Sequence, residues 1–333
     1  MIGKLKRIRI ANLPTPIEKA FNLSETLGVN VWFKRDDYTG IGLWGNKARK
    51  LEFLIADVLD KGCDTIITSC GIQSNWARMV VAVANKFRLK TYLILRTAQF
   101  KDIPKEYDGN LLLDYILGAD IKMVKLGIDE ESTQAIDELY SELKSRGCKP
   151  YVIPAGGETA LGALGYYKAF MEILYQAEEM DLNFNYIIHA TGGGATQAGL
   201  VLGLKSTGLK TRVIGINVGA YSGERLRRNV VNFANEAAEI MDLNVKVNEN
   251  EAMVINDYTF GGYGLASREV IEAIKLAAHT EGVILEPVYT GKAMVGLVDL
   301  AKRKMIKNDD NVLFIHTGGV PGIFPYRHLF NQY

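Results

Sequence analysis

Short apolar runs alternate with segments of helical periodicity along most of the chain. The runs predict strands, and the periodic segments predict helices. The expected strands are 64–68, 91–95, 121–124, 151–153, 186–190, 212–216 and 312–315. The expected helices are 75–87, 110–117, 130–145, 164–178, 196–206, 223–241 and 267–280. Because strands that are separated by helices pair in parallel through crossovers, the predicted fold class is α/β.

The length of the chain suits two compact domains. It has 333 residues, of which 48% are apolar, and a domain typically holds about 150 residues. One large domain is the alternative. No low-complexity linker or internal repeat divides the sequence, so we expect the boundary near residues 154–157, where one series of strand–helix units ends and another begins.

Charge and composition exclude several classes of function. The chain has 39 Lys and Arg against 38 Asp and Glu, so bulk electrostatics predict neither a nucleic-acid nor a membrane partner. Its three cysteines and four histidines are dispersed, which predicts no metal site and no disulfide framework. The first residues lack the apolar core of a leader, and no run has the length of a membrane span. We therefore expect a cytoplasmic protein.

The segment 45–53, Gly-Asn-Lys-Ala-Arg-Lys-Leu-Glu-Phe, places a lysine beside a glycine and an asparagine where a helical pattern begins. A fixed amine of this kind can bond covalently to the aldehyde of a cofactor and can later act as a base. The plainer interpretation is that Lys47, Arg49 and Lys50 form the solvated first turn of an amphipathic helix. Two distant loops favour the first interpretation.

One of these loops is 191–196, Thr-Gly-Gly-Gly-Ala-Thr, which follows an expected strand and opens an expected helix. Consecutive glycines let backbone N–H groups approach an anion, and the helix N-terminus adds partial positive charge. The loop matches neither the dinucleotide fingerprint nor Walker A. We therefore expect a single phosphate monoester here, with a tight turn that binds nothing as the alternative.

The other loop, 71–75, also connects an expected strand to an expected helix. Ser74 is a natural N-cap, so capping alone could account for it. The functional interpretation is that N–H groups here hold a substrate carboxylate, while Asn75 bonds a cofactor oxygen. All three segments lie where parallel sheets bind ligands, at the carboxyl ends of their strands.

Taken together, these segments resemble the pyridoxal-phosphate (PLP) enzymes of fold type II, the tryptophan-synthase-β-like group. More narrowly, they resemble the family of D-cysteine desulfhydrase and 1-aminocyclopropane-1-carboxylate (ACC) deaminase. The motifs that carry the resemblance are 13–16, 33–40, 45–52, 71–75, 196–200, 287–294 and 314–319. The strings GNKARKLE and PVYTGKAM are the most specific part.

The resemblance implies two three-layer domains with parallel sheets, in a homodimer that acts on a small amino acid. The large PLP-binding domain would comprise residues 1–50 plus 162–333, and the small domain residues 51–161. Lys47 would be the Schiff-base lysine, and Asn75 would face the phenolic oxygen of PLP. The phosphate would lie on Gly192, Gly193, Gly194, Ala195 and Thr196.

Further roles follow from the same resemblance. Thr290 would face the pyridine nitrogen, and Thr317 would complete the cofactor site. The substrate would be bound by Ser74, Asn75, Trp76 and Tyr289. Ser74, Tyr263 and Tyr289 would join Lys47 as catalytic residues.

Position 290 favours one activity within the family. Deaminases of the family carry glutamate where this chain has Thr290. A carboxylate favours the protonated pyridine nitrogen and so strengthens electron withdrawal, whereas a hydroxyl leaves that nitrogen largely neutral. Opening a cyclopropane demands the stronger withdrawal. We therefore expect α,β-elimination by a D-cysteine desulfhydrase that releases sulfide, pyruvate and ammonia. ACC deaminase and L-cysteate sulfo-lyase are the alternatives.

Two tryptophans depart from the family pattern. Trp44 stands where relatives usually have glycine, and Trp76 replaces a histidine or glutamine. Either both rings narrow the pocket, or they pack against each other in a domain contact. If they block the pocket, the chain would be a non-catalytic protein that binds PLP or an amino acid. Glu286, in place of the usual aspartate, is a milder change.

Overall fold

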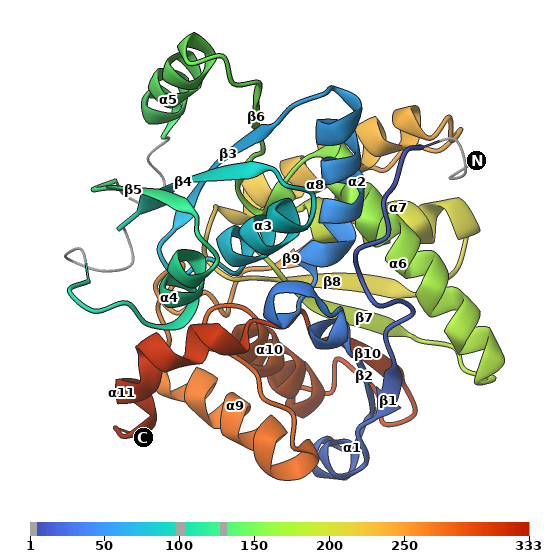
Figure 1. The fold of residues 1–333 in the computed structure, drawn as a ribbon. Helices are drawn as coiled ribbons and strands as arrows, with labels where there is room; N and C mark the ends of the chain where they lie inside the picture. Colours follow the sequence, from blue (N-terminus) through green and yellow to red (C-terminus); the bar gives the residue numbers. More distant parts are fainter. Residues whose placement is uncertain (1–4, 98–103, 127–131, 333) are drawn as a thin grey trace.

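The computed structural model describes residues 5–97, 104–126 and 132–332, whose strands form two sheets (Figure 1). The six-stranded sheet has the order β1-β2-β10-β7-β8-β9, and the four-stranded sheet has the order β5-β4-β3-β6. The larger sheet contains β1 (Ile17–Lys19), β2 (Asn30–Lys34), β7 (Tyr186–Thr191), β8 (Arg212–Asn217), β9 (Met253–Ile255) and β10 (Asn311–Ile315). The smaller contains β3 (Thr65–Gly71), β4 (Lys90–Arg96), β5 (Asp120–Val124) and β6 (Pro150–Val152). All neighbouring strands are parallel except β1 and β2.

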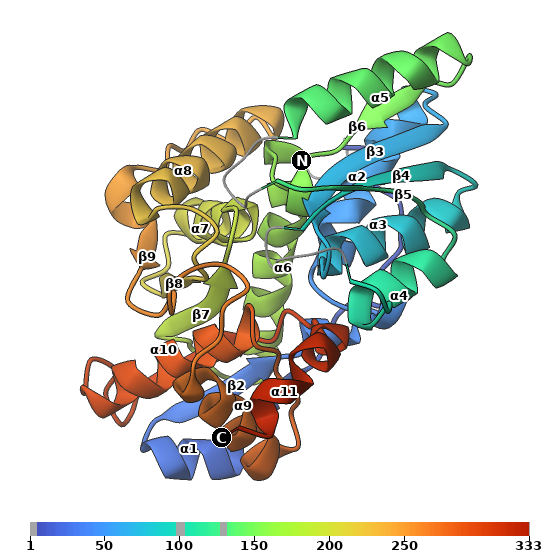
Figure 2. The ribbon, with the colours of Figure 1, turned by 90° about the vertical axis from the view of Figure 1, so that its left-hand side faces the viewer.

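Helices cover both faces of the six-stranded sheet (Figures 1 and 2). On one face lie α6 (Ala160–Glu179), α7 (Ala195–Thr207) and α8 (Gly223–Ile240), and on the other lie α1 (Phe21–Leu27), α9 (Arg268–Glu281) and α10 (Thr290–Lys302). Helices pack on both faces of this sheet because both faces are apolar. Strand β10 illustrates this, since its side chains alternate between the two faces. Leu313 and Ile315 pack in the first core, and Val312 and Phe314 in the second.

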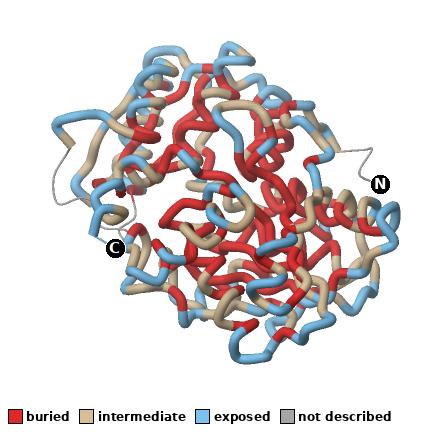
Figure 3. The backbone as a smooth tube through the Cα atoms, turned by 90° about the horizontal axis from the view of Figure 1, so that it is seen from below, coloured by how far each residue is buried: buried red, intermediate tan, exposed pale blue. Residues whose placement is uncertain are grey.

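The four-stranded sheet is also covered on both faces. The helices α2 (Lys47–Asp60) and α3 (Asn75–Lys86) pack against Ile66 and Leu93, while α5 (Thr133–Ser145) packs against Ile67 and Ile94 on the other face. The helix α4 (Gly109–Ile116) lies beside α3, and α11 (Arg327–Phe330) ends the described chain. Figure 3 shows the buried backbone concentrated in the interior and the exposed backbone at the periphery. Among the described residues, no helix combines the length and apolarity that a membrane crossing requires.

The predicted α/β class is confirmed, and the predicted strands and helices are present. Residues 130 and 131 of the expected helix 130–145 lie outside the described residues. We propose that the two sheets are the cores of the two predicted domains, 1–50 plus 162–333 and 51–161. Helix α2 crosses the boundary proposed between them.

Strands β1, β2 and β9 and helices α1, α10 and α11 were not predicted. Strands β1 and β9 have three residues each, so their periodicity is hard to recognise. Helix α10 is buried around most of its circumference, including its glycines and Lys292. It therefore lacks the polar stripe by which a surface helix is recognised.

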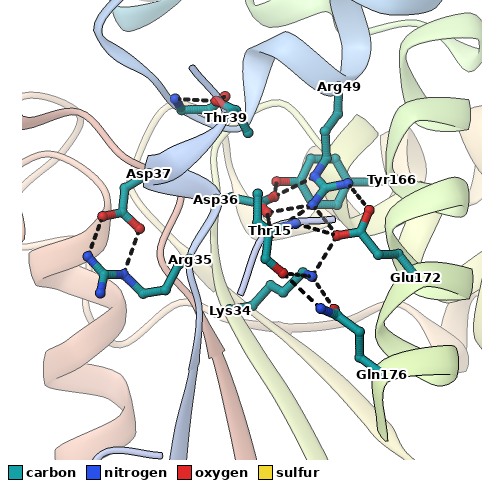
Figure 4. A network of polar contacts seen from close by, with 11 residues as sticks. Thr15, Lys34, Arg35, Asp36, Asp37, Thr39, Arg49, Tyr166, Glu172 and Gln176 are labelled. Carbon is teal, nitrogen blue, oxygen red and sulfur yellow. Dashed lines mark hydrogen bonds and ion pairs between the residues drawn. The ribbon is translucent and has the colours of Figure 1, made fainter. Parts of the chain in front are cut away.

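A buried network of charges fixes α2, the helix that begins at Lys47 (Figure 4). The guanidinium of Arg49 donates to both carboxylate oxygens of Asp36, at 2.9 and 2.7 Å. It also donates to both oxygens of Glu172 on α6, at 3.0 and 2.8 Å. Tyr166 donates to Asp36 at 2.5 Å, and Lys34 donates to Glu172 at 2.6 Å. Helix α2 is thus bound to both β2 and α6.

The pKa of Asp36 shows which effect dominates. Burial alone would raise it, but the charge and hydrogen bonds of Arg49 outweigh burial and lower the pKa. Asp36 is therefore a carboxylate with no exposure to water. Such a group is tolerated inside a protein only while its partner is present.

We predict that Arg49→Met lowers the free energy of unfolding by about 3–5 kcal/mol, because it leaves the Asp36 carboxylate buried and unpaired. Urea denaturation would measure the loss. Arg303→Met is the control, since it removes an exposed pair with Asp299 on α10 and should change stability little. Equal effects of the two substitutions would contradict the role given to the network.

Candidate active site

A pocket lies at the carboxyl ends of strands from both sheets. Its walls come from the segments that follow β3, β4, β6, β7, β8 and β10, together with the start of α2. Of the predicted site residues, it is lined by Lys47, Ser74, Asn75, Trp76, Gly192, Gly193, Gly194, Thr196, Tyr263, Tyr289 and Thr317. Ala195 and Thr290 do not line it and lie in the first turns of α7 and α10. The structure therefore brings together most of the predicted site.

Lys47 reaches the pocket because the chain before it is fixed against the segment after β10. Gly45 and Gly318 form a β-bridge, and Asn46 N–H donates to the Thr317 carbonyl at 3.1 Å. Gly45 has a φ of 139°, and a Cβ there would lie 3.0 Å from the Thr317 carbonyl oxygen. Only glycine suits this close approach. Helix α2 then begins at Lys47 itself.

The amine of Lys47 is suited to act as a nucleophile or base near neutral pH. Burial and, to a smaller extent, the charge of Lys50 together lower its pKa to about 7, while the charge of Glu158 opposes both effects. A lysine in water would be almost entirely protonated at that pH. Its environment thus supplies an uncharged amine.

The interpretation of this segment as a solvated helix turn is wrong. Arg49 and Lys50 are buried, and Lys50 donates to Glu158 at 2.7 Å and to the Gly156 carbonyl at 3.1 Å. The amine of Lys50 is therefore engaged by an ion pair, whereas Lys47 is the lysine on the pocket wall.

The glycine turn before α7 binds an anion within the protein itself. Ala195 N–H donates to a carboxylate oxygen of Glu158 at 2.5 Å. A Cβ on Gly193 would lie 2.3 Å from Glu158 Cγ, and Gly194 has a φ of 110°. Burial would raise the pKa of Glu158, but the charges of Lys50 and Lys47 outweigh it, so the net shift is downward. The turn has the backbone donors that a phosphate would need.

Glu158 is a functional candidate that the sequence reasoning missed. It stands directly after two glycines, in the loop that follows β6. Ligands bind at the carboxyl ends of parallel strands, and this rule, which pointed to the other segments, applied to the loop after β6 as well. The segment 154–157 was instead interpreted only as a domain boundary. Other pocket residues to which the sequence reasoning gave no role include Cys70, Arg96 and Tyr221.

The loop before α3 is capped as its sequence predicts. Ser74 Oγ accepts from Trp76 N–H at 3.2 Å and from Ala77 N–H at 3.3 Å. Asn75 accepts from the amide of Asn110 at 2.9 Å, which fixes its orientation at the pocket. Capping therefore explains Ser74 in part, and its role toward a substrate carboxylate stays a prediction.

Two tyrosines meet at the opposite wall. The hydroxyls of Tyr263 and Tyr289 are 2.5 Å apart, and their rings are in an edge arrangement with centroids 5.7 Å apart. Burial raises the pKa of Tyr263 to about 12 and that of Tyr289 well above its ordinary value. Tyr289 occupies the N-cap position of α10.

Thr290 has a carboxylate beside it. Its hydroxyl accepts from Glu286 N–H at 2.9 Å and lies 3.5 Å from a carboxylate oxygen of Glu286. That carboxylate also accepts backbone N–H groups of Val288, Tyr289 and Thr290. Burial raises the pKa of Glu286 to about 7. A carboxylate is therefore present near position 290 in this chain as well. For this reason the difference between Thr290 and the glutamate of the deaminases is a weaker argument against ACC deaminase activity than the sequence alone indicates.

The two unusual tryptophans have separate environments. Trp76 is buried, donates to Thr68 Oγ1 at 2.9 Å and lines the pocket. Trp44 is 46% exposed and contacts the ring of Tyr38 edge-on, with centroids 6.2 Å apart. Of the two, only Trp76 lines the pocket. Trp44 has a φ of 66°, a conformation that favours glycine and accounts for the family pattern at this position.

Comparison with known proteins agrees with this geometry. The family described as pyridoxal-phosphate dependent enzymes matches residues 8–318. A protein of Pyrococcus abyssi named putative 1-aminocyclopropane-1-carboxylate deaminase is 40% identical over 326 residues, 98% of this chain and 95% of that one. The 1-aminocyclopropane-1-carboxylate deaminase of Rhizobium rhizogenes is 38% identical over 337 residues, with both chains wholly covered.

Solved structures give the same result. The crystal structure of an ACC deaminase homologue has a TM-score of 0.89 and 40% identity, and the match covers 99% of this chain and 97% of the other. Threonine deaminase isoform 2 from Solanum lycopersicum has a TM-score of 0.67 at 19% identity, covering 97% and 83%. This second match shows a likeness of fold alone.

The pocket fits PLP, the cofactor of these enzymes. The glycine turn leaves space that a side chain would fill, since a Cβ on Gly192 would lie 3.4 Å from a ring carbon of Tyr289. The buried hydroxyl of Thr191 has no hydrogen-bond partner among the described residues. Lys47 supplies an amine for the aldehyde. Among the described residues, no cluster of three or more His, Cys, Asp or Glu could hold a metal ion.

We predict that covalent capture of PLP accelerates as the pH rises through about 7, because the uncharged Lys47 amine is the attacking form. Glu158→Gln should move the midpoint of this profile to lower pH, since the carboxylate of Glu158 raises the pKa of Lys47. Stopped-flow absorbance would follow the rate. Glu251→Gln is the matched control, because Glu251 forms a similar pair with Lys205 away from the pocket. An unmoved midpoint in Glu158→Gln would contradict the coupling.

Proposed function

The chain belongs to the pyridoxal-phosphate dependent enzymes, and from that premise we propose that it is a deaminase whose substrate is ACC. The observation that carries the proposal is the convergence, in one pocket, of the Lys47 amine and the hydrogen-bonded pair Tyr263 and Tyr289. This arrangement places a proton acceptor and a proton donor around one substrate. The choice of substrate is supported by full-length relatives that are named for it.

When bound, PLP supplies an electron-withdrawing ring that is conjugated with the substrate nitrogen. ACC has no hydrogen on its α-carbon, so the proton to be removed lies on a ring methylene carbon. We assign its removal to Lys47 Nζ, which is partly uncharged near pH 7. We assign to Tyr263 Oη the proton that the carbon receives when the ring opens. The overall reaction consumes one water and yields 2-oxobutyrate and ammonia.

The chain also orients the substrate and excludes water. The N-terminus of α3, capped by Ser74, carries partial positive charge and would attract the substrate carboxylate. Asn75 and Trp76 line the same wall. The buried ring of Trp76 replaces water on that side of the pocket with an apolar surface. Gly192 to Thr196 would hold the cofactor phosphate, with Thr317 beside it.

D-Cysteine desulfhydrase is the second candidate, and Thr290 is the observation that favours it. The position has a hydroxyl where deaminases of the family carry glutamate. Two observations count against this candidate. The Glu286 carboxylate lies 3.5 Å from the Thr290 hydroxyl, so a carboxylate is still present near this position. The names of the relatives also favour the deaminase. The homodimer and the cytoplasmic location also remain proposals.

A panel of three substrates tests the proposal. We expect 2-oxobutyrate and ammonia from ACC, at a rate well above sulfide release from D-cysteine or sulfite release from L-cysteate. Lys47→Ala should abolish turnover, while Lys302→Ala, an exposed lysine on α10, should not affect it.

The other outcomes of the panel are equally decisive. Sulfide from D-cysteine without 2-oxobutyrate would establish the second candidate. Sulfite from L-cysteate would identify a sulfo-lyase. PLP bound at Lys47 with no turnover of any D- or L-amino acid would indicate a protein that binds the cofactor without catalysis.

A further inference from the structure

Lys292, on the first turns of α10, is a buried lysine whose three N–H groups all meet backbone carbonyls. Nζ donates to the carbonyls of Val218 at 3.0 Å, Thr259 at 2.7 Å and Gly262 at 2.7 Å. The side chain has no exposure to water. An ammonium has three donors, so its hydrogen-bonding capacity is fully used.

Fold stability alone does not account for a charge at this position. Among the described residues, no carboxylate lies within ion-pair distance of Lys292. Burial lowers its pKa to about 8, and the charge of Glu286 opposes that shift. A buried cation without a paired anion costs desolvation energy that a neutral residue would avoid.

The three carbonyls that accept hydrogen bonds from Lys292 belong to two segments of the pocket wall. Val218 directly follows β8 and precedes Ala220 and Tyr221, which line the pocket. Thr259 and Gly262 belong to the turn that leads into Tyr263. Lys292 therefore joins the end of one strand to the turn that carries a predicted catalytic tyrosine.

Independent contacts show how closely these segments approach. Tyr263 N–H donates to the Gly219 carbonyl at 3.0 Å. Gly219 has a φ of 86°, and a Cβ there would lie 2.7 Å from the carbonyl carbon of Gly262. On the other side, Tyr326 donates to the Gly264 carbonyl at 2.7 Å. The backbone of Tyr263 is thus held from both sides.

Helix α10 and the Tyr263 segment are also connected at a second point. Tyr289 stands at the N-cap of α10, three residues before Lys292, and its hydroxyl bonds that of Tyr263 at 2.5 Å. Helix α10 consequently contacts the Tyr263 segment at two places, through the hydroxyl of Tyr289 and through the ammonium of Lys292. A shift of the turn would separate the two hydroxyls.

We propose that Lys292 is a positioning residue for the tyrosine pair: its ammonium holds the 259–262 turn against the end of β8 and so sets the Tyr263 hydroxyl at the pocket. The catalytic consequence rests on the proposed function, in which Tyr263 donates a proton. The positional consequence concerns the two hydroxyls alone and does not depend on it.

The test uses Lys292→Met and Lys292→Gln in the PLP-loaded enzyme, with Lys302→Met as the control on the same helix. The first readout is ¹³C NMR of ring-labelled tyrosine without substrate, with the two signals assigned by their loss in Tyr263→Phe and Tyr289→Phe. We expect both signals to shift in the Lys292 variants and to stay in place in Lys302→Met. Absorbance of the cofactor bound at Lys47 should be unchanged.

The second readout is turnover. We expect Lys292→Met to lower kcat about tenfold or more with little change in KM, and to add less than twofold when Tyr263 is already phenylalanine. A mainly structural residue would instead have the same effect in both backgrounds.

Several results would overturn the proposal. They are unshifted tyrosine signals in folded Lys292 variants, an undiminished effect in the Tyr263→Phe background, and failure of both variants to fold, which would make the role structural. If no substrate is turned over, the proposed function fails while the NMR comparison still decides the position of the pair.

Discussion

The proposed chemistry of this site depends on the removal of one amine from water. Burial lowers the pKa of Lys47 to about 7, and that desolvation turns a common basic residue into a nucleophile and a base at neutral pH. The neighbouring charges adjust the effect in opposite directions. Lys50 favours the uncharged amine, and Glu158 favours the charged one. The amine is thus set between two groups that are themselves paired.

The rest of the fold keeps this amine in place. On one side of α2, Arg49 joins the turn after β2 to α6 through the buried carboxylate of Asp36 and the partly buried carboxylate of Glu172. On another side, Lys50 reaches the loop after β6 through Glu158. The chain before Lys47 is fixed against the segment after β10. Elements of both sheets therefore position the helix that begins at Lys47.

Much of the candidate site could be predicted because it obeys a rule of topology. The loops 71–75 and 191–196 each follow a parallel strand, and strand ends at one edge of a sheet converge. The glycine turn before α7 was recognisable from its glycines, and Lys47 from its sequence neighbours. The α/β class followed from the alternation of strands and helices for the same reason.

The remaining features depend on contacts that no sequence period encodes. Glu158 reaches the glycine turn from the loop after β6, and Glu286 lies beside Thr290 through the local geometry of the α10 N-terminus. Lys292 lies in the motif 287–294, but nothing in the sequence indicates that its amine is buried against three backbone carbonyls. The two tryptophans looked alike in sequence, yet one is buried and the other is exposed. In each case the direction of the side chain determines what it contacts, and the sequence does not reveal that direction.

Locating the covalent bond to the cofactor tests the role of Lys47 most directly. Protein supplied with PLP would be reduced with borohydride and digested, and the modified peptide identified by mass spectrometry. The account predicts the pyridoxyl group on Lys47 and none on Lys47→Ala. A group found on Lys50, or an adduct of equal yield in Lys47→Ala, would contradict it.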